Sequence, residues 1–154
     1  MKRFVVLIIC IFLVGSFLCL PAAATELNEQ NGQILISETV EYVGNNAYYI
    51  ERIYIPSIQT YSNAKTGTKT AQYITGGTTI YTISVTGNFT YDGTSSNATS
   101  ASYSIATYVE DATIKSGNAY TSGASAIATG SVTYHGATLQ KTVTLTCDKN
   151  GKLS

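Results

Sequence analysis

Hydrophobic and polar residues alternate along most of the chain after residue 32, most clearly after Gly76-Gly77. The apolar positions there share one parity: Tyr81, Ile83, Val85, Phe89 and Tyr91. Thr, Ser and Asn occupy the other parity, so this stretch is predicted to be an antiparallel strand with one buried face. Gly87 interrupts the apolar parity and indicates a β-bulge or the close approach of another backbone.

Further strands follow from the same alternation and from the turn residues between them. They are expected over 33–43, 47–55, 69–75, 78–91, 101–109, 112–115, 124–134 and the stretch after His135-Gly136. The first two form a hairpin around Gly44-Asn45-Asn46, and Ser116-Gly117-Asn118 reads as another turn. These short strands without a helical period predict an all-β fold, an antiparallel β-sandwich with an Ig-like topology as one option.

The first 24 residues have a different character from the rest. Lys2 and Arg3 precede an apolar run from Phe4 to Leu20, and small residues end at Ala24. This pattern predicts a signal peptide that is cleaved after Ala24, with an uncleaved membrane anchor as the alternative. Residues 25–154 then form a single β-sandwich domain with a loose lead-in over 25–32, secreted to the extracellular space or cell surface without a stable membrane anchor.

Charge argues against a nucleic-acid partner. The predicted leader carries two of the nine basic residues and none of the nine acidic ones, which leaves a net charge of −2 on residues 25–154. The lysines are dispersed and form no basic stripe.

Residues that could carry catalysis or bind a metal are few. His135 is the only histidine, and no Gly-x-Ser-x-Gly motif accompanies it. Glu110 and Asp111 are adjacent and therefore point to opposite sides of an extended chain. One histidine and one cysteine cannot make a closed zinc site, and Asp148 to Gly151 suits a type I turn better than a calcium loop. We expect no metal and no cofactor.

Several charged or reactive residues have a structural interpretation. Glu38, Glu41 and Glu51 are predicted to be solvated charges at a sheet edge, where they discourage aggregation. Lys141 interrupts an apolar face near the start of the last strand, where its head would reach water. Cys147 has the inward parity and is predicted to be buried, with an intermolecular disulfide as the alternative.

Tyrosine is the one residue type that suggests binding. The chain has 12 tyrosines and no tryptophan, and Tyr48 and Tyr49 are consecutive, so one of the two must face outward. The candidate binding residues are Tyr42, Tyr48, Tyr49, Tyr54 and Tyr108. The competing interpretation is that tyrosines replace phenylalanine in the core with their tips at the surface.

Several segments together resemble an uncharacterised group of small secreted proteins from Gram-positive bacteria. They are 37–42, 49–51, Thr86-Gly87-Asn88-Phe89-Thr90-Tyr91-Asp92-Gly93, 141–147 and 150–154. The resemblance implies a secreted bacterial β domain and no particular activity. It also implies a second cysteine after the Phe-x-Tyr-x-Gly segment and tryptophans elsewhere, but this chain has no cysteine over 98–102 and has Tyr81 at one tryptophan position.

These observations predict a non-enzymatic extracellular protein that associates with the cell envelope by binding cell-wall glycan or another extracellular protein. One alternative is a small secreted hydrolase of wall material that uses Glu110, Asp111 or His135. A second alternative is a diffusible, bacteriocin-like effector.

Overall fold

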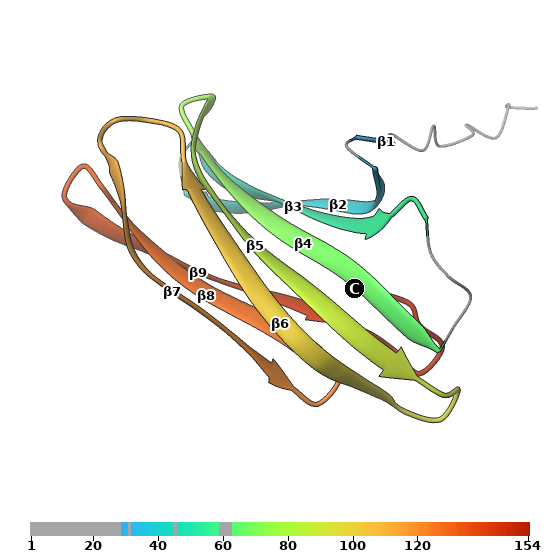
Figure 1. Ribbon diagram of the computed structural model, residues 1–154. Helices are drawn as coiled ribbons and strands as arrows, with labels where there is room; N and C mark the ends of the chain where they lie inside the picture. Colours follow the sequence, from blue (N-terminus) through green and yellow to red (C-terminus); the bar gives the residue numbers. More distant parts are fainter. Residues whose placement is uncertain (1–28, 31, 45, 59–62) are drawn as a thin grey trace, which may run out of the picture.

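The computed structural model describes residues 29–30, 32–44, 46–58 and 63–154, which form strands and turns. The predicted signal peptide lies outside the described residues. The strands are β1 (Glu29–Gln30), β2 (Gln33–Gly44), β3 (Ala47–Pro56), β4 (Ala64–Thr75), β5 (Thr78–Tyr91), β6 (Ser96–Thr107), β7 (Ala112–Ser122), β8 (Ser125–Tyr134) and β9 (Ala137–Thr146) (Figure 1). The short strand β1 lies within the segment that was expected to be a loose lead-in.

The strands form two antiparallel sheets that pack face to face, consistent with a β-sandwich. Sheet A has six strands in the order β1-β2-β3-β4-β5-β6, and sheet B has three in the order β7-β8-β9. Each sheet is thus a meander among the described strands. An Ig-like sandwich requires Greek-key connections between its sheets, so this strand order gives the Ig-like option no support.

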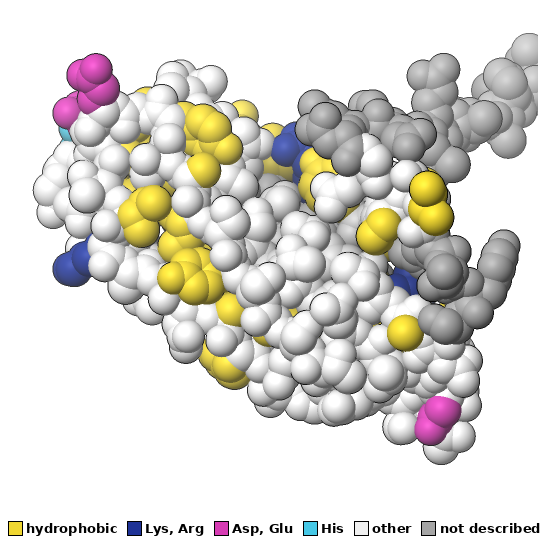
Figure 2. Space-filling model, viewed as in Figure 1, with side chains coloured by type: hydrophobic (Ala, Val, Ile, Leu, Met, Phe, Trp, Pro, Cys, Tyr) yellow, Lys and Arg dark blue, Asp and Glu magenta, His cyan; other side chains and the backbone are white. Residues whose placement is uncertain are grey.

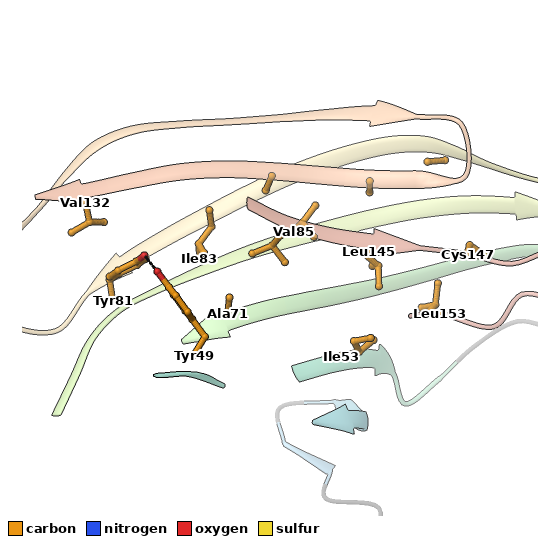
Figure 3. Close-up of a cluster of buried hydrophobic side chains, with 14 of the residues drawn as sticks. Tyr49, Ile53, Ala71, Tyr81, Ile83, Val85, Val132, Leu145, Cys147 and Leu153 are labelled. Carbon is orange, nitrogen blue, oxygen red and sulfur yellow. Dashed lines mark hydrogen bonds between the residues drawn. The ribbon is translucent and has the colours of Figure 1, made fainter. Parts of the chain in front are cut away.

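The core lies between the two sheets, and its residues come from the apolar parity of each strand (Figure 3). On β5 the side chains of Tyr81, Ile83, Val85 and Phe89 are at most 1% exposed, which confirms the predicted buried face. Sheet B contributes the buried side chains Ala126, Ala128, Val132, Val143 and Leu145. Cys147 is also buried, as its parity predicted.

The predicted hairpin turns after β4 and β8 are confirmed by their backbone conformation. Gly76 and Gly77 both have positive φ, and so do His135 and Gly136. Positive φ at both central residues gives a two-residue turn whose twist matches that of the strands. At Gly87 the close approach comes from side chains and not from another backbone, because a Cβ on this residue would lie 2.6 Å from the Cβ of Ala126 in sheet B.

One predicted turn is wrong. Ser116-Gly117-Asn118 lies inside the continuous strand β7, which runs from Ala112 to Ser122. A Cβ on Gly117 would meet the ring of Tyr103, so this glycine makes room for an aromatic ring that crosses from β6. A glycine that packs against a ring cannot be distinguished from a turn glycine by sequence alone.

The two sheets differ in width, and this difference exposes part of sheet A. Sheet B packs against β4, β5 and β6. The hairpin of β2 and β3 extends beyond β9 at the side of the sandwich (Figure 1). Both surfaces of β2 are therefore accessible at this side.

Candidate functional site

The outer face of sheet A, which points away from sheet B, carries the candidate binding surface. Side chains on β3 alternate between the two faces, so Tyr48, Arg52 and Tyr54 lie on the outer face, opposite in direction to buried Tyr49. The register places Tyr42 beside Tyr48 and Glu38 beside Arg52. No described strand packs on this face.

Two tyrosines form an exposed aromatic pair at one end of this face. The ring centroids of Tyr42 and Tyr48 are 5.8 Å apart, and the ring planes are tilted by 50°. Tyr42 is 79% exposed, whereas Tyr48 is half-buried and supports it. Tyr42 therefore presents most of its ring to the solvent, and the pair offers an apolar surface with two hydroxyl groups.

A chain of hydrogen-bonded side chains lies on the same face, separated from the aromatic pair by Val40 and Ile50, and crosses four strands. Arg52 Nε donates to Glu38 Oε2 at 2.6 Å, and its second donor, Nη1, bonds Gln72 Oε1 at 2.9 Å. Gln72 Nε2 then donates to Thr79 Oγ1 at 2.9 Å. These hydrogen bonds orient the guanidinium of Arg52, the carboxylate of Glu38 and the amide of Gln72, and so they orient the polar atoms that point outward.

Toward the other end of the outer face the polar side chains are uncharged. Thr66 donates to Asn88 Oδ1 at 2.6 Å, and Asn88 Nδ2 donates to Ser100 Oγ at 2.7 Å. The hydroxyls of Thr68 and Thr86 are 2.9 Å apart. In the view of Figure 2, backbone and side chains that are neither charged nor hydrophobic cover most of the surface, and hydrophobic side chains occur in small patches.

The structure places three of the five predicted binding tyrosines on one face but brings only Tyr42 and Tyr48 into contact. Tyr42, Tyr48 and Tyr54 share the outer face of the β2–β3 hairpin. Tyr49 is only 6% exposed and belongs to the core, so a surface ligand cannot contact it. Tyr108 is 59% exposed, but it follows β6, and β4 and β5 separate it from the aromatic pair.

Sequence reasoning did not identify the polar part of this surface. Arg52 and Gln72 share a parity with the outward residues of their strands, which is the one signal that could have found them. Their contact depends on the register of β3 against β4, where Ile50 is opposite Gln72 and Arg52 is opposite Thr70. Parity does not fix that register.

The inner face of the β2–β3 hairpin carries a charged cluster that corrects two predictions. Lys141 Nζ lies 3.0 Å from Glu51 Oε1 and also bonds Glu41, and Lys69 Nζ lies 3.4 Å from Glu51 Oε2. The side chain of Lys141 is 13% exposed and that of Glu51 is 19% exposed. Glu51 is therefore not a solvated edge charge, and the head of Lys141 does not reach open water.

The electrostatics of this cluster favour the charged forms. Burial raises the pKa of Glu51, but the hydrogen bond and charge of Lys141 and the charge of Lys69 outweigh it and hold the pKa below its ordinary value. Burial lowers the pKa of Lys141, but its bonds to Glu41 and Glu51 raise it overall. The groups neutralise one another, so the cluster is a structural tie between the sheets.

Two of the three predicted catalytic candidates, His135 and Asp111, lie close together on an exposed surface. His135 Nδ1 lies 3.8 Å from Asp111 Oδ2, and both side chains are mostly exposed. The described part of the chain has no cluster of three or more His, Cys, Asp or Glu that could hold a metal. It also has no helix that is long and apolar enough to cross a membrane.

A shallow depression of about 300 Å³ lies near the end of β5, lined in part by Asn63, Thr90 and Asp92. The Asp92 carboxylate accepts the backbone N–H groups of Ser95 and Thr94, which lower its pKa. It therefore serves as a turn cap and has little capacity as a base.

Comparison with known proteins identifies neither a family nor a related fold for this chain. No protein-family model, curated protein or solved structure matches the chain.

Proposed function

We propose that the protein is a secreted, non-enzymatic β-sandwich that binds glycan of the cell envelope through the outer face of sheet A. The observation that carries this proposal is that the exposed Tyr42–Tyr48 pair shares one open face with the hydrogen-bonded chain of Glu38, Arg52 and Gln72. The positively charged and apolar start of the chain supports export from the cytoplasm.

The chemistry of a sugar ring suits this surface. A pyranose has faces of C–H groups, which pack against an aromatic ring, and a rim of hydroxyl groups that both donate and accept hydrogen bonds. Tyr42 supplies the ring, and Arg52, Glu38 and Gln72 supply a planar donor, an acceptor and an amide. Because internal bonds already order these side chains, a ligand would lose little of its binding free energy to ordering them.

The uncharged remainder of the face favours a hydroxyl-rich polymer over a protein partner. Thr68, Thr86, Asn88 and Ser100 continue the polar surface toward β6. The centre of a protein–protein interface is usually more apolar than the surrounding surface. A long glycan could instead contact hydroxyls and amides along several strands.

Co-sedimentation with insoluble cell-wall glycan tests the proposal. We expect the wild-type protein to sediment with the glycan and to be released by soluble glycan fragments. Tyr42→Ala and Arg52→Met should each weaken retention by about tenfold, because an aromatic or charge-assisted contact contributes roughly 1–2 kcal/mol. Tyr120→Ala is the matched control, since Tyr120 is 49% exposed on β7 in the other sheet.

Two results would contradict the proposal. The first is that the wild-type protein does not sediment with the glycan, or that Tyr42→Ala and Tyr120→Ala are retained equally well. The second is the release of soluble wall fragments by the purified protein, lost in a His135→Ala variant, which would favour the hydrolase. Circular dichroism of each variant separates a lost contact from a lost fold.

A further inference from the structure

Strand β2 is an edge strand whose outer side is largely open. Among the described residues, only Gln33 and Ile34 pair with β1 on that side. From Leu35 to Gly44 no described strand pairs with β2 on the side away from β3. Alternate backbone N–H and C=O groups of β2 therefore point outward on that side. Register shifts after Leu35 and after Tyr42 leave a regular stretch from Ser37 to Tyr42.

This edge is also unusually apolar. Four of the nine exposed large hydrophobic side chains in the described part of the protein lie on β2: Ile36, Val40, Tyr42 and Val43. Val40 is 48% exposed in the middle of the regular stretch. An open edge with exposed apolar side chains is a template for pairing with another strand.

The charges that would normally protect such an edge are neutralised from within the protein. Glu38 bonds Arg52 on the outer face, and Glu41 bonds Lys141 on the inner face. The edge strand β7 differs in this respect, because its exposed Lys115 has no ion pair among the described residues. The edge of β2 therefore has little net charge to repel a second strand.

We propose that β2 pairs antiparallel with β2 of a second copy of this chain, about a two-fold axis at Val40. This register sets Val40 opposite Val40, Glu38 opposite Tyr42, and Thr39 opposite Glu41. Charges of like sign are not opposed, and Val40 meets an apolar partner. The two six-stranded sheets become one continuous sheet, with both outer faces on the same side.

The pairing has a defined stoichiometry. Each copy uses its own β2 edge, so the interface is isologous and the assembly closes at the dimer. The pairing does not depend on glycan binding. If both occur, the dimer would present two aromatic pairs near its axis, and its binding to a polymer would be bivalent.

Analytical ultracentrifugation of the chain, expressed from Met1 in a secreting bacterial host, provides the test. We expect a concentration-dependent dimer for the wild type. Val40→Glu places carboxylates opposite each other beside Glu38, and it should raise the dimer dissociation constant by at least about tenfold. Tyr120→Glu, which adds the same charge to β7, should leave the dissociation constant unchanged.

A cysteine at the axis tests the register directly. Side chains directly opposite each other in a sheet are close enough for a disulfide. Val40→Cys should therefore form a covalent dimer on a non-reducing gel after mild oxidation, whereas Tyr120→Cys should not, and Cys147 is 1% exposed and stays reduced. A monomeric wild type, a Val40→Glu protein that still dimerises, or equal cross-linking of the two cysteine variants would overturn the proposal.

Discussion

The ammonium group of Lys141 on β9 lies 4.2 Å from the centroid of the Tyr49 ring on β3. The same group bonds Glu51 on β3 and Glu41 on β2. One lysine thus connects sheet B to the β2–β3 hairpin through a cation–π contact and two ion pairs. Because sheet B packs mainly against β4, β5 and β6, the stability of the hairpin should depend on Lys141.

Replacement of Lys141 tests this dependence. Lys141→Met keeps an unbranched side chain but removes the charge, which leaves Glu51 partly buried with only Lys69 as its partner. We expect the free energy of unfolding to fall by about 1–3 kcal/mol, less than for a fully buried pair because water reaches part of the cluster. Urea denaturation measures the change.

Two further variants show whether the charge cluster is the cause. Lys115→Met removes an exposed lysine on β7 and should change the free energy of unfolding by less than about 0.5 kcal/mol. The double variant Lys141→Met with Glu51→Gln should lose less stability than the sum of the single variants, because the two residues interact directly. Strict additivity would count against the cluster.

The lowered pKa of Glu51 predicts a loss of stability in acid. In the folded protein Glu51 binds a proton less readily than its ordinary pKa of 4.5 implies. Its contribution to stability is therefore complete above about pH 4.5 and is lost as the pH falls through the folded-state value. Urea midpoints measured from pH 7 to pH 3 should show this decline.

Glu51→Gln isolates the contribution of this one carboxylate. Backbone hydrogen bonds also lower the pKa of Asp92 and Asp148, so some loss of stability in acid should persist in the variant. The decline below pH 4.5 should nevertheless be shallower than in the wild type. Parallel pH profiles for the two proteins would mean that Glu51 contributes nothing to acid sensitivity.

The sequence predicted the strands well because each buried face repeats with a period of two. The turns at Gly76-Gly77 and His135-Gly136 were also predictable, since two-residue turns need positive φ. The turn predicted at Gly117 is wrong because a glycine that accommodates a ring has the same sequence pattern as a turn glycine. The buried strand faces and the two-residue turns depend on residues that are adjacent in the sequence, so the sequence pattern is enough to predict them.

The candidate site was less predictable because it depends on contacts between distant segments. Nothing in the sequence indicates that Lys141 reaches Glu41 and Glu51, which lie in the other sheet. The bonds from Arg52 to Glu38 and Gln72 likewise require the pairing of three strands in one register. Tyrosine parity identified the outer face only in part, since parity alone could not choose between Tyr48 and Tyr49.

A buried pair of hydroxyl groups gives a prediction about the core. Tyr49 Oη and Tyr81 Oη are 2.7 Å apart, and both side chains are buried (Figure 3). Tyr81→Phe would leave the hydroxyl of Tyr49 without this partner, and it should cost about 1–2 kcal/mol of stability. The double variant Tyr49→Phe with Tyr81→Phe should be more stable than either single variant, because it leaves no unpaired hydroxyl. Thermal denaturation of all four proteins completes the cycle, and additive losses would contradict the pairing.

The distance between the sheets near Gly87 leads to a last prediction. A Cβ on this residue would lie 2.6 Å from the Cβ of Ala126 and 2.7 Å from Cζ of Phe89, both of which are buried. Neither neighbour can move aside without shifting the opposite sheet or an aromatic ring, so Gly87→Ala should reduce stability by about 1–3 kcal/mol. Gly44→Ala is the control, since a Cβ there meets nothing within 4 Å and no positive φ is required. Adding Ala126→Gly to Gly87→Ala should recover part of the loss by removing one of the two clashes. If Gly87→Ala and Gly44→Ala had equal effects on the urea midpoint, close packing at Gly87 would not limit the approach of the sheets.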